Sequence, residues 1–204
     1  MREDADPSLL PAEYALLSSR VGLALANATL LQQTRDAAVT DPLTGIKNRR
    51  HFDAALEHED AIRQRIPAEK RPLRSAILFD LDHFGSVNKR FGHQTGDRVL
   101  RLFADTLKAR IRNSDLVARY GGEEFVVILD GASRDEATAI AEQVRKAFAK
   151  QSVDTGTGDR LNSTVSAGCS TLEPWEVEGV LLLERADVAL AMAKAGGRDQ
   201  VVAA

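Results

Sequence analysis

The chain has 204 residues, of which 44% are hydrophobic and 28% are charged, and its formal net charge is −3. This composition is typical of a soluble globular protein with room for one ordinary domain and an appendage. The slightly acidic balance argues against a nucleic-acid partner and against an anionic membrane surface, because both attract clustered basic residues. No apolar run approaches the ~18 residues of a membrane span, so we expect no such span and a cytoplasmic location.

The first part of the chain predicts one long helix, from about Pro7 to Val39. Apolar or small side chains recur along it in steps of four and three, at Leu17, Val21, Ala24, Ala28 and Leu31. Such heptads are typical of a coiled coil, although a helix packed on its own domain would show a similar stripe. We therefore expect two parts, a coiled-coil-type helix over residues 1–40 and a globular domain over residues 41–204.

Helices and strands alternate after a break at Asp41-Pro42-Leu43-Thr44-Gly45, where proline and glycine end the long helix. Helices are expected at 49–65, 87–91, 95–112, 134–150 and 177–195. Strands are expected at 75–79, 116–118, 125–129 and 164–170, with a short one at the end. This order predicts an α+β domain whose central sheet is mostly antiparallel and flanked by helices. The single cysteine, Cys169, falls in the strand at 164–170 and is expected to be a buried thiol rather than a reactive one.

The hairpin between the second and third strands contains two glycines followed by two glutamates. Gly121 and Gly122 are expected to form the tight turn, because glycine adopts a positive φ without a steric cost. Alternation along the next strand sends Glu123 and Glu124 to opposite faces, which predicts different roles for them. An ordinary hairpin with solvated glutamates is the alternative interpretation.

A second acidic motif follows the first apolar strand, which ends in Asp80-Leu81-Asp82. One carboxylate that closes a buried strand and another that opens its neighbour can meet at a single divalent ion. Mg²⁺ takes oxygen ligands, usually one or two carboxylates completed by substrate phosphates and water. Downstream, Asn88 and the segment Gly92-His93-Gln94-Thr95-Gly96-Asp97 supply polar side chains that can read the edge of a nucleobase.

Five ordered motifs resemble those of the GGDEF family of diguanylate cyclases, namely Asp41–Arg50, Phe79–Phe84, Gly92–Asp97, Gly121–Phe125 and Ala193–Arg198. The resemblance covers about Asp41 to Val202 and implies a palm-like domain of the ferredoxin-like, nucleotidyl cyclase type. It also implies that two GTP molecules are condensed into cyclic di-GMP with release of pyrophosphate. The family further implies a homodimer joined through the N-terminal helix and an upstream sensor module that is missing from this chain.

The resemblance assigns the metal site and the reacting centre to three segments. It implies Mg²⁺ or Mn²⁺ in a two-metal arrangement, with Asp80, the carbonyl of Leu81 and Glu123 as ligands. Glu124 matches a position close to the attacking hydroxyl or to the second metal. Asp82 and His83 are equally well explained as groups that stabilise the turn after the strand.

The resemblance also assigns the nucleotide contacts. Asn88 and Asp97 match the residues that read guanine, and a carboxylate that accepts from the guanine amide edge favours GTP over ATP. Phe84 is expected to border the substrate. Lys194 and Arg198 match a phosphate clamp, although two cations near the end of a helix are also favourable without a ligand.

Two features depart from the family pattern, and both concern cations near the substrate. Gly85 stands where the family usually has lysine, so GTP could bind more weakly, while Lys89 follows Asn88 in place of the usual aspartate. A catalytically silent domain that binds GTP or cyclic di-GMP and signals through its helix is therefore the alternative function. A hybrid synthase that accepts ATP is disfavoured by Asp97.

An Arg-x-x-Asp motif at Arg112 and Asp115 resembles the family's inhibitory product site. Arginine can pair bidentately with a product phosphate or a guanine edge, and aspartate can accept from guanine. A helix-terminal arginine beside an aspartate turn is the alternative. The second arginine that some members supply from the next helix is Gln143 here, with Arg145 close by, so we expect weaker inhibition.

Overall fold

The computed structural model describes residues 19–25, 39–156 and 158–204 of the chain. The chain divides into two compact units, Met1–Val39 and Thr40–Ala204, and each is described by itself. Among the described residues, none of the helices is both long enough and apolar enough to cross a bilayer.

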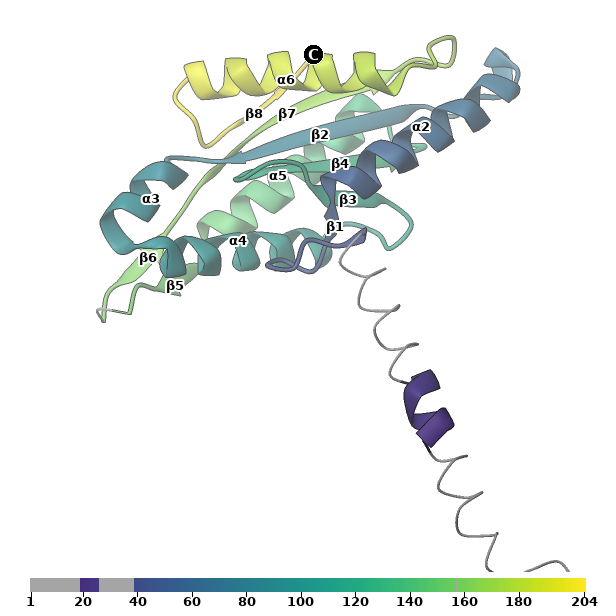
Figure 1. The fold of residues 1–204 in the computed structure, drawn as a ribbon. Coiled ribbons are helices and arrows are strands. Elements are labelled where there is room, and N and C mark those ends of the chain that lie inside the picture. The colour runs from purple at the N-terminus through teal and green to yellow at the C-terminus, as the bar shows by residue number, and fades with distance from the viewer. Residues whose placement is uncertain (1–18, 26–38, 157) are drawn as a thin grey trace, which may run out of the picture. The chain divides into compact units, whose positions relative to one another are not determined.

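The described part of the first unit is a helix at residues 19–25, drawn in purple in Figure 1. Its apolar side chains Val21, Leu23 and Leu25 are all exposed. Ala24, the other described position of the predicted seam, is exposed as well, and Leu17, Ala28 and Leu31 lie outside the described residues. The coiled coil therefore stays a prediction.

The described residues of the second unit form a six-stranded sheet in the order β1 (Lys47–Asn48), β3 (Leu116–Arg119), β4 (Glu124–Asp130), β2 (Arg74–Leu81), β7 (Val165–Leu172) and β8 (Val201–Ala203). The central pairings β3–β4, β4–β2 and β2–β7 are antiparallel, whereas the edge pairings β1–β3 and β7–β8 are parallel. A separate antiparallel ribbon consists of β5 (Ser152–Asp154) and β6 (Arg160–Asn162). The predicted α+β domain with a mostly antiparallel sheet is confirmed.

Helices cover both faces of this sheet (Figure 1). One face packs against α2 (Arg49–Arg65) and α6 (Gly179–Ala195), and the other packs against α4 (His93–Lys108) and α5 (Arg134–Ala149). The short helices α3 (Phe84–Phe91) and η1 (Ala68–Lys70) lie in the connections that follow and precede β2. Local capping starts two of the long helices: the Asn48 side chain accepts from the His51 N–H at 2.9 Å, and Ser133 with Glu136 forms a capping box.

Helices α3 and α4 differ most from their predicted bounds, and both differences have local causes. Helix α3 begins at Phe84 rather than at Val87, because His83 adopts a left-handed conformation (φ 56°) that turns the chain from β2 directly into the helix. Helix α4 ends at Lys108 rather than at Arg112. Beyond it, two successive N–H groups, those of Arg110 and Ile111, share the carbonyl of Leu107, which tightens the chain into a turn.

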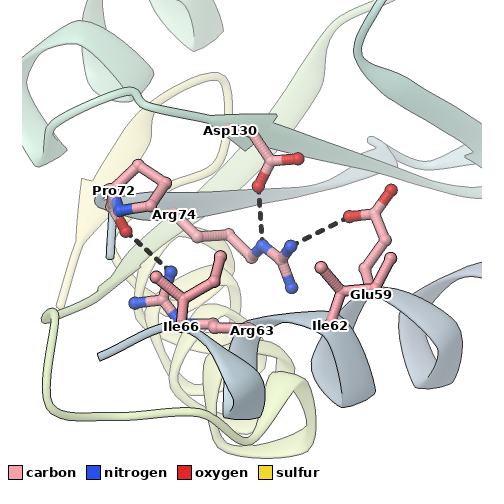
Figure 2. Close-up of a pocket in the computed structure, with 7 residues that line it drawn as sticks. All are labelled: Glu59, Ile62, Arg63, Ile66, Pro72, Arg74 and Asp130. Atoms are coloured by element: carbon pink, nitrogen blue, oxygen red, sulfur yellow. Dashed lines mark hydrogen bonds and ion pairs between the residues drawn. The ribbon is translucent and has the colours of Figure 1, made fainter. Parts of the chain in front are cut away.

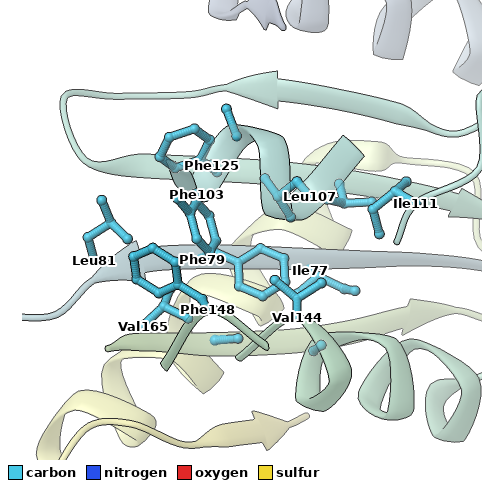
Figure 3. Close-up of a cluster of buried hydrophobic side chains, with 14 of the residues drawn as sticks. Ile77, Phe79, Leu81, Phe103, Leu107, Ile111, Phe125, Val144, Phe148 and Val165 are labelled. Atoms are coloured by element: carbon cyan, nitrogen blue, oxygen red, sulfur yellow. The ribbon is translucent and has the colours of Figure 1, made fainter. Parts of the chain in front are cut away.

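The larger core lies between the sheet and helices α4 and α5, and four phenylalanines form its centre (Figure 3). The ring of Phe103 on α4 meets Phe79, Phe125 and Phe148 edge to face, with centroids 4.8 to 5.5 Å apart. Along β2, odd-numbered side chains face this core, while Ala76 and Leu78 face α2 and α6. Alternation along the strand therefore puts Asp80 on the α6 side.

The opposite end of β2 is fixed by a network of ion pairs around Arg74 (Figure 2). Its buried guanidinium contacts Asp130 at 2.7 Å, Glu59 at 3.0 Å and Asp60 at 3.1 Å. Burial and the nearby charge of Asp130 raise the pKa of Glu59. Arg63 donates to three backbone carbonyls, which tie α2 to the loops before β2 and α6. The network holds the first residues of β2 against the last residue of β4.

The strand β7 runs directly beneath α6. A side chain at Gly168 would collide with the backbone of α6, so this glycine is required for the close approach of strand and helix. Cys169, the next residue, is buried, and burial raises the pKa of its thiol to about 12. The predicted burial of the thiol is confirmed.

Candidate active site

The candidate site lies at the end of the sheet where β2 finishes and β4 begins. Antiparallel pairing places Asp80 directly opposite Glu124. One residue further on, the Leu81 N–H donates to the carbonyl of Glu123 at 3.2 Å. The two acidic motifs of the sequence are therefore brought together by the β2–β4 register, as the sequence predicts.

The charges at this end of the sheet act on one another. Lys194, in the last turn of α6, places its Nζ 2.8 Å from Oδ2 of Asp80. Burial, followed by the charge of Asp80, raises the pKa of Glu123, while Lys194 acts in the opposite direction and Glu124 adds to the rise. The site is thus an acidic cluster partly neutralised by one lysine.

The glycines of the turn have a different role from the predicted one. Neither Gly121 nor Gly122 adopts a positive φ, so the expectation that they supply this conformation is wrong. A side chain at Gly121 would instead collide with the carboxylate of Glu124, which lies against it. Gly122 has open space around its missing Cβ within the described chain. One glycine makes room for the catalytic candidate, and the other leaves the turn accessible.

The turn is held by Arg119, which sequence reasoning missed. Its guanidinium donates to the carbonyl of Gly122 at 2.6 and 3.2 Å and reaches both oxygens of Asp41 at 3.1 and 3.2 Å. Burial alone would raise the pKa of Asp41, but hydrogen bonds from Thr44 and the charge of Arg119 lower it overall. The opening motif of the domain thus anchors the Gly121-Gly122 turn, a contact that no sequence spacing indicates.

The predicted guanine-reading residues lie on two successive helices, Asn88 on α3 and Asp97 on α4. The Oδ1 atom of Asn88 is buried and has no hydrogen-bond partner among the described residues. It lies against Gly96, where any side chain would collide with it, and Asp97 follows as a half-buried residue. An unsatisfied buried acceptor costs about 1–3 kcal/mol, so a hydrogen-bond donor that reached Asn88 would stabilise this segment.

Of the other predicted substrate contacts, only Lys194 lies at the acidic cluster. The side chain of Phe84 is 7% exposed and belongs to the main core, so only its backbone is available to a substrate. Arg198 lies beyond the end of α6, exposed and with a φ of 66°. Lys194 contacts the acidic cluster, whereas the second cation of the predicted clamp does not touch it.

The residues after β2 have a structural role. Asp82 accepts hydrogen bonds from the hydroxyls of Thr164 and Ser166, both at 2.7 Å, and from the Asp199 N–H at 3.0 Å. It therefore ties the end of β2 to β7 and to the segment before β8, in agreement with the interpretation as a stabilising group. His83 is exposed and caps no helix with its side chain.

The predicted product site forms a turn beyond α4. The Arg112 N–H donates to Oδ2 of Asp115 at 3.2 Å, and the Asp115 N–H donates to the Arg112 carbonyl at 3.0 Å. Both residues line a surface cavity of about 350 Å³ that α5 borders with Glu136. Arg145 is engaged elsewhere, because it forms ion pairs with Glu142 and Asp199.

The donor set fits a metal that the substrate helps to bind. Among the described residues, no group of three or more acidic, histidine or cysteine side chains is arranged to hold a metal ion. Asp80 and Glu123 nevertheless provide two carboxylates whose charges act on each other. This matches the one or two carboxylates that Mg²⁺ takes when phosphates and water complete its shell.

Comparison with known proteins assigns the family. The family model described as "Diguanylate cyclase, GGDEF domain" matches residues 38–200. Diguanylate cyclase DgcP of Pseudomonas aeruginosa is 42% identical over 171 residues, which cover 84% of this chain and 25% of that protein. Response regulator PleD of Caulobacter vibrioides is 40% identical over 173 residues, which cover 84% of this chain and 37% of that protein.

Solved structures agree in fold. The coiled coil and GGDEF domain of DgcB from Caulobacter crescentus, in complex with c-di-GMP, matches with a TM-score of 0.82 at 31% identity, covering 95% of this chain and all of that one. The active GGEEF domain of a diguanylate cyclase from Vibrio cholerae matches with a TM-score of 0.66 at 30% identity, covering 76% of this chain and 96% of that one.

The chain belongs to the GGDEF family of diguanylate cyclases and has its palm-like α+β fold. The resemblance read from the five sequence motifs is confirmed. The chain spans between 25% and 48% of the length of the curated relatives it matches.

Proposed function

We propose that this chain is an active diguanylate cyclase, which condenses two GTP molecules into cyclic di-GMP and releases pyrophosphate. The observation that supports this most strongly is the acidic cluster of Asp80, Glu123 and Glu124 with Lys194 beside it. In each half-reaction, the 3′-hydroxyl of one GTP attacks the α-phosphate of the other. Such a displacement depends on charge neutralisation and on in-line positioning rather than on a covalent intermediate.

Asp80 and Glu123, with the carbonyl of Leu81, would hold Mg²⁺ or Mn²⁺. When bound, such an ion neutralises the negative charge of the phosphates in a two-metal arrangement. We expect Glu124 to act near the attacking hydroxyl, and its carboxylate lies against Gly121 in the turn. Burial and the charge of Asp80 raise the pKa of Glu123, and a cation held between the two carboxylates would offset their mutual repulsion.

The base pocket selects guanine. Asp97 can accept from both the ring N–H and the exocyclic amine of guanine, and the unpaired Asn88 oxygen is a further acceptor in the same pocket. Adenine presents no matching pair of donors, so ATP is a poor substrate. Lys194 and Arg198 contact the triphosphate, and the backbone N–H groups at Gly85 assist in place of the usual lysine.

Catalysis requires two copies of the domain, because a bound GTP cannot attack its own α-phosphate to give this product. The two active-site halves face each other with two-fold symmetry, and the N-terminal helix holds them together. Arg112 and Asp115 bind product and inhibit the enzyme. This inhibition is weak because Arg145 is held by Glu142 and Asp199 and is not free to join the product site.

Incubation with GTP and Mg²⁺, followed by chromatographic separation of the nucleotides, tests the proposal directly. Cyclic di-GMP formed by the wild type, and not by Glu123→Gln, would support it. The catalytically silent alternative, favoured by Gly85, predicts GTP or cyclic di-GMP binding without any product. Mixed or adenine-containing products from GTP with ATP would instead indicate the hybrid synthase.

A further inference from the structure

A groove separates the two helices that cover one face of the sheet. Helices α2 and α6 enclose a cavity of about 470 Å³ whose floor is the sheet itself. The apolar part of the lining comes from Leu56 on α2, Leu78 on β2, and Val180 and Leu183 on α6. This volume and its apolar lining are in the range of sites that bind side chains or small molecules. In the view of Figure 1, β2 passes between α6 and α2.

Exposed apolar side chains also lie along α6. Val180, Val188 and Met192 follow one another at intervals of eight and four residues and are 61%, 59% and 59% exposed, with the exposed Glu184 halfway between the first two. A helix on the surface of a domain normally presents polar side chains to solvent. Exposed apolar side chains among charged ones beside a groove are typical of a site for another macromolecule.

The rim of the groove is negatively charged. Four carboxylates border it, and none of its described lining residues is a lysine or an arginine. Asp53 has a partner, because Arg49 lies 3.7 Å from it. No described residue forms an ion pair with Glu57 on α2 or with Glu184 and Asp187 on α6, so both walls of the groove offer free negative charge.

We propose that this groove binds the apolar face of a cationic amphipathic helix from another protein. Apolar side chains of such a helix would occupy the floor, and its lysines or arginines would meet the carboxylates on both walls. The charge argues against the chain's own N-terminal segment as the occupant. Residues 1–38 contain five acidic and three basic residues, so this segment is itself acidic.

One end of the groove is Tyr120, the residue that leads into the catalytic turn. Its ring packs edge to face on Phe52, with centroids 5.6 Å apart, and the guanidinium of Arg49 lies 4.3 Å from the ring centroid. Its N–H donates to the Glu124 carbonyl at 2.8 Å. A bound helix therefore contacts the residue that carries the hairpin, whether or not the domain makes cyclic di-GMP.

The proposal is tested by NMR titration of the full chain with two synthetic amphipathic helices. One peptide is built of leucine and lysine, and the other is built of leucine and glutamate. The lysine peptide should bind, with shift changes concentrated on α2, α6 and Tyr120. The glutamate peptide should not bind. A triple variant, Glu57→Gln, Glu184→Gln and Asp187→Asn, neutralises the rim. It should lower the affinity for the lysine peptide about tenfold.

A matched triple variant removes the same charge from exposed positions elsewhere, through Glu69→Gln, Asp135→Asn and Asp159→Asn. An equal loss of binding in this control would overturn the proposal, because attraction would then reflect net charge alone. Shift changes scattered over the surface would overturn it as well. Sedimentation compares the oligomeric state of the wild type and the rim variant. A wild-type dimer that is lost in the rim variant would identify a second copy of this chain as the occupant and exclude a foreign helix.

Discussion

Replacing Lys194 with methionine should tighten Mn²⁺ binding to the nucleotide-free protein and weaken GTP binding. Lys194 lies 2.8 Å from Asp80, the carboxylate that we propose as a metal ligand. The ammonium and the metal therefore compete for Asp80 until a triphosphate offers Lys194 a second anionic partner. A rise in Mn²⁺ affinity together with a fall in GTP affinity is specific to this competition. Loss of an ion pair with a purely structural role would not change the two affinities in opposite directions.

The size of the effect follows from the exposure of the pair. The Asp80 side chain is 10% exposed and that of Lys194 is 35% exposed. Two unit charges near a protein surface attract by about 4 kcal/mol at 4 Å for an effective dielectric constant of 20. Solvent screening and side-chain entropy reduce such a pair to roughly 1 kcal/mol. Removing this competition should tighten Mn²⁺ binding about fivefold, because 1.4 kcal/mol corresponds to one factor of ten.

Free Mn²⁺ measured by electron paramagnetic resonance during titration gives the metal affinity, and calorimetry with a non-hydrolysable GTP analogue gives the nucleotide affinity. Both should be measured at a pH well above the raised pKa of Glu123, where the carboxylates are ionised. Arg198→Met is the matched control for the metal titration and should leave Mn²⁺ binding unchanged, because Arg198 is exposed and lies outside the acidic cluster. Unchanged or weaker Mn²⁺ binding in Lys194→Met would refute the competition.

Four further outcomes are expected. Asp80→Ala should lower turnover about a hundredfold or more with an unchanged circular dichroism spectrum, and substantial residual activity would rule out its role as a ligand. Asp97→Ala should relax the GTP/ATP preference by about 1–3 kcal/mol in competition assays, whereas an unchanged ratio would assign base reading to another residue. Arg112→Ala should relieve inhibition by added cyclic di-GMP at an unchanged maximal rate; a flat wild-type titration would make this motif a structural turn. Glutamate at Val21 and Leu31 should yield monomers that are slow when dilute and partly recover when concentrated, and a fully active dilute monomer would contradict dimer-dependent catalysis.

The sheet and its acidic edge were predictable because their signals are local. The run from Phe125 to Leu129 is apolar and β-branched or aromatic, and two glycines before it mark a hairpin, so the antiparallel pairing could be inferred directly. The bounds of α3 and α4 were not predictable. They depend on a left-handed histidine at position 83 and on a tightened turn after Leu107, and neither residue type favours such a conformation from sequence alone.

The contacts between distant segments were the other part that sequence could not supply. The approach of Lys194 to Asp80 depends on how α6 crosses β7, which is fixed by the absence of a side chain at Gly168. The clamp from Arg119 to Asp41 joins residues 78 positions apart. Motif resemblance assigned Lys194 to the phosphates but gave no indication of its ion pair with a proposed metal ligand.

Both ends of the β2–β4 pair are fixed by one register, and this links the stability of the domain to the geometry of the site. Arg74 pairs with Asp130 in the ladder and also through an ion pair of 2.7 Å, and six residues later Asp80 meets Glu124. A slip by one residue would send Asp80 to the opposite face, away from Lys194 and into the phenylalanine core. Burying an unpaired carboxylate there is strongly unfavourable. The ion-pair network around Arg74 therefore stabilises the same strand alignment that assembles the acidic cluster.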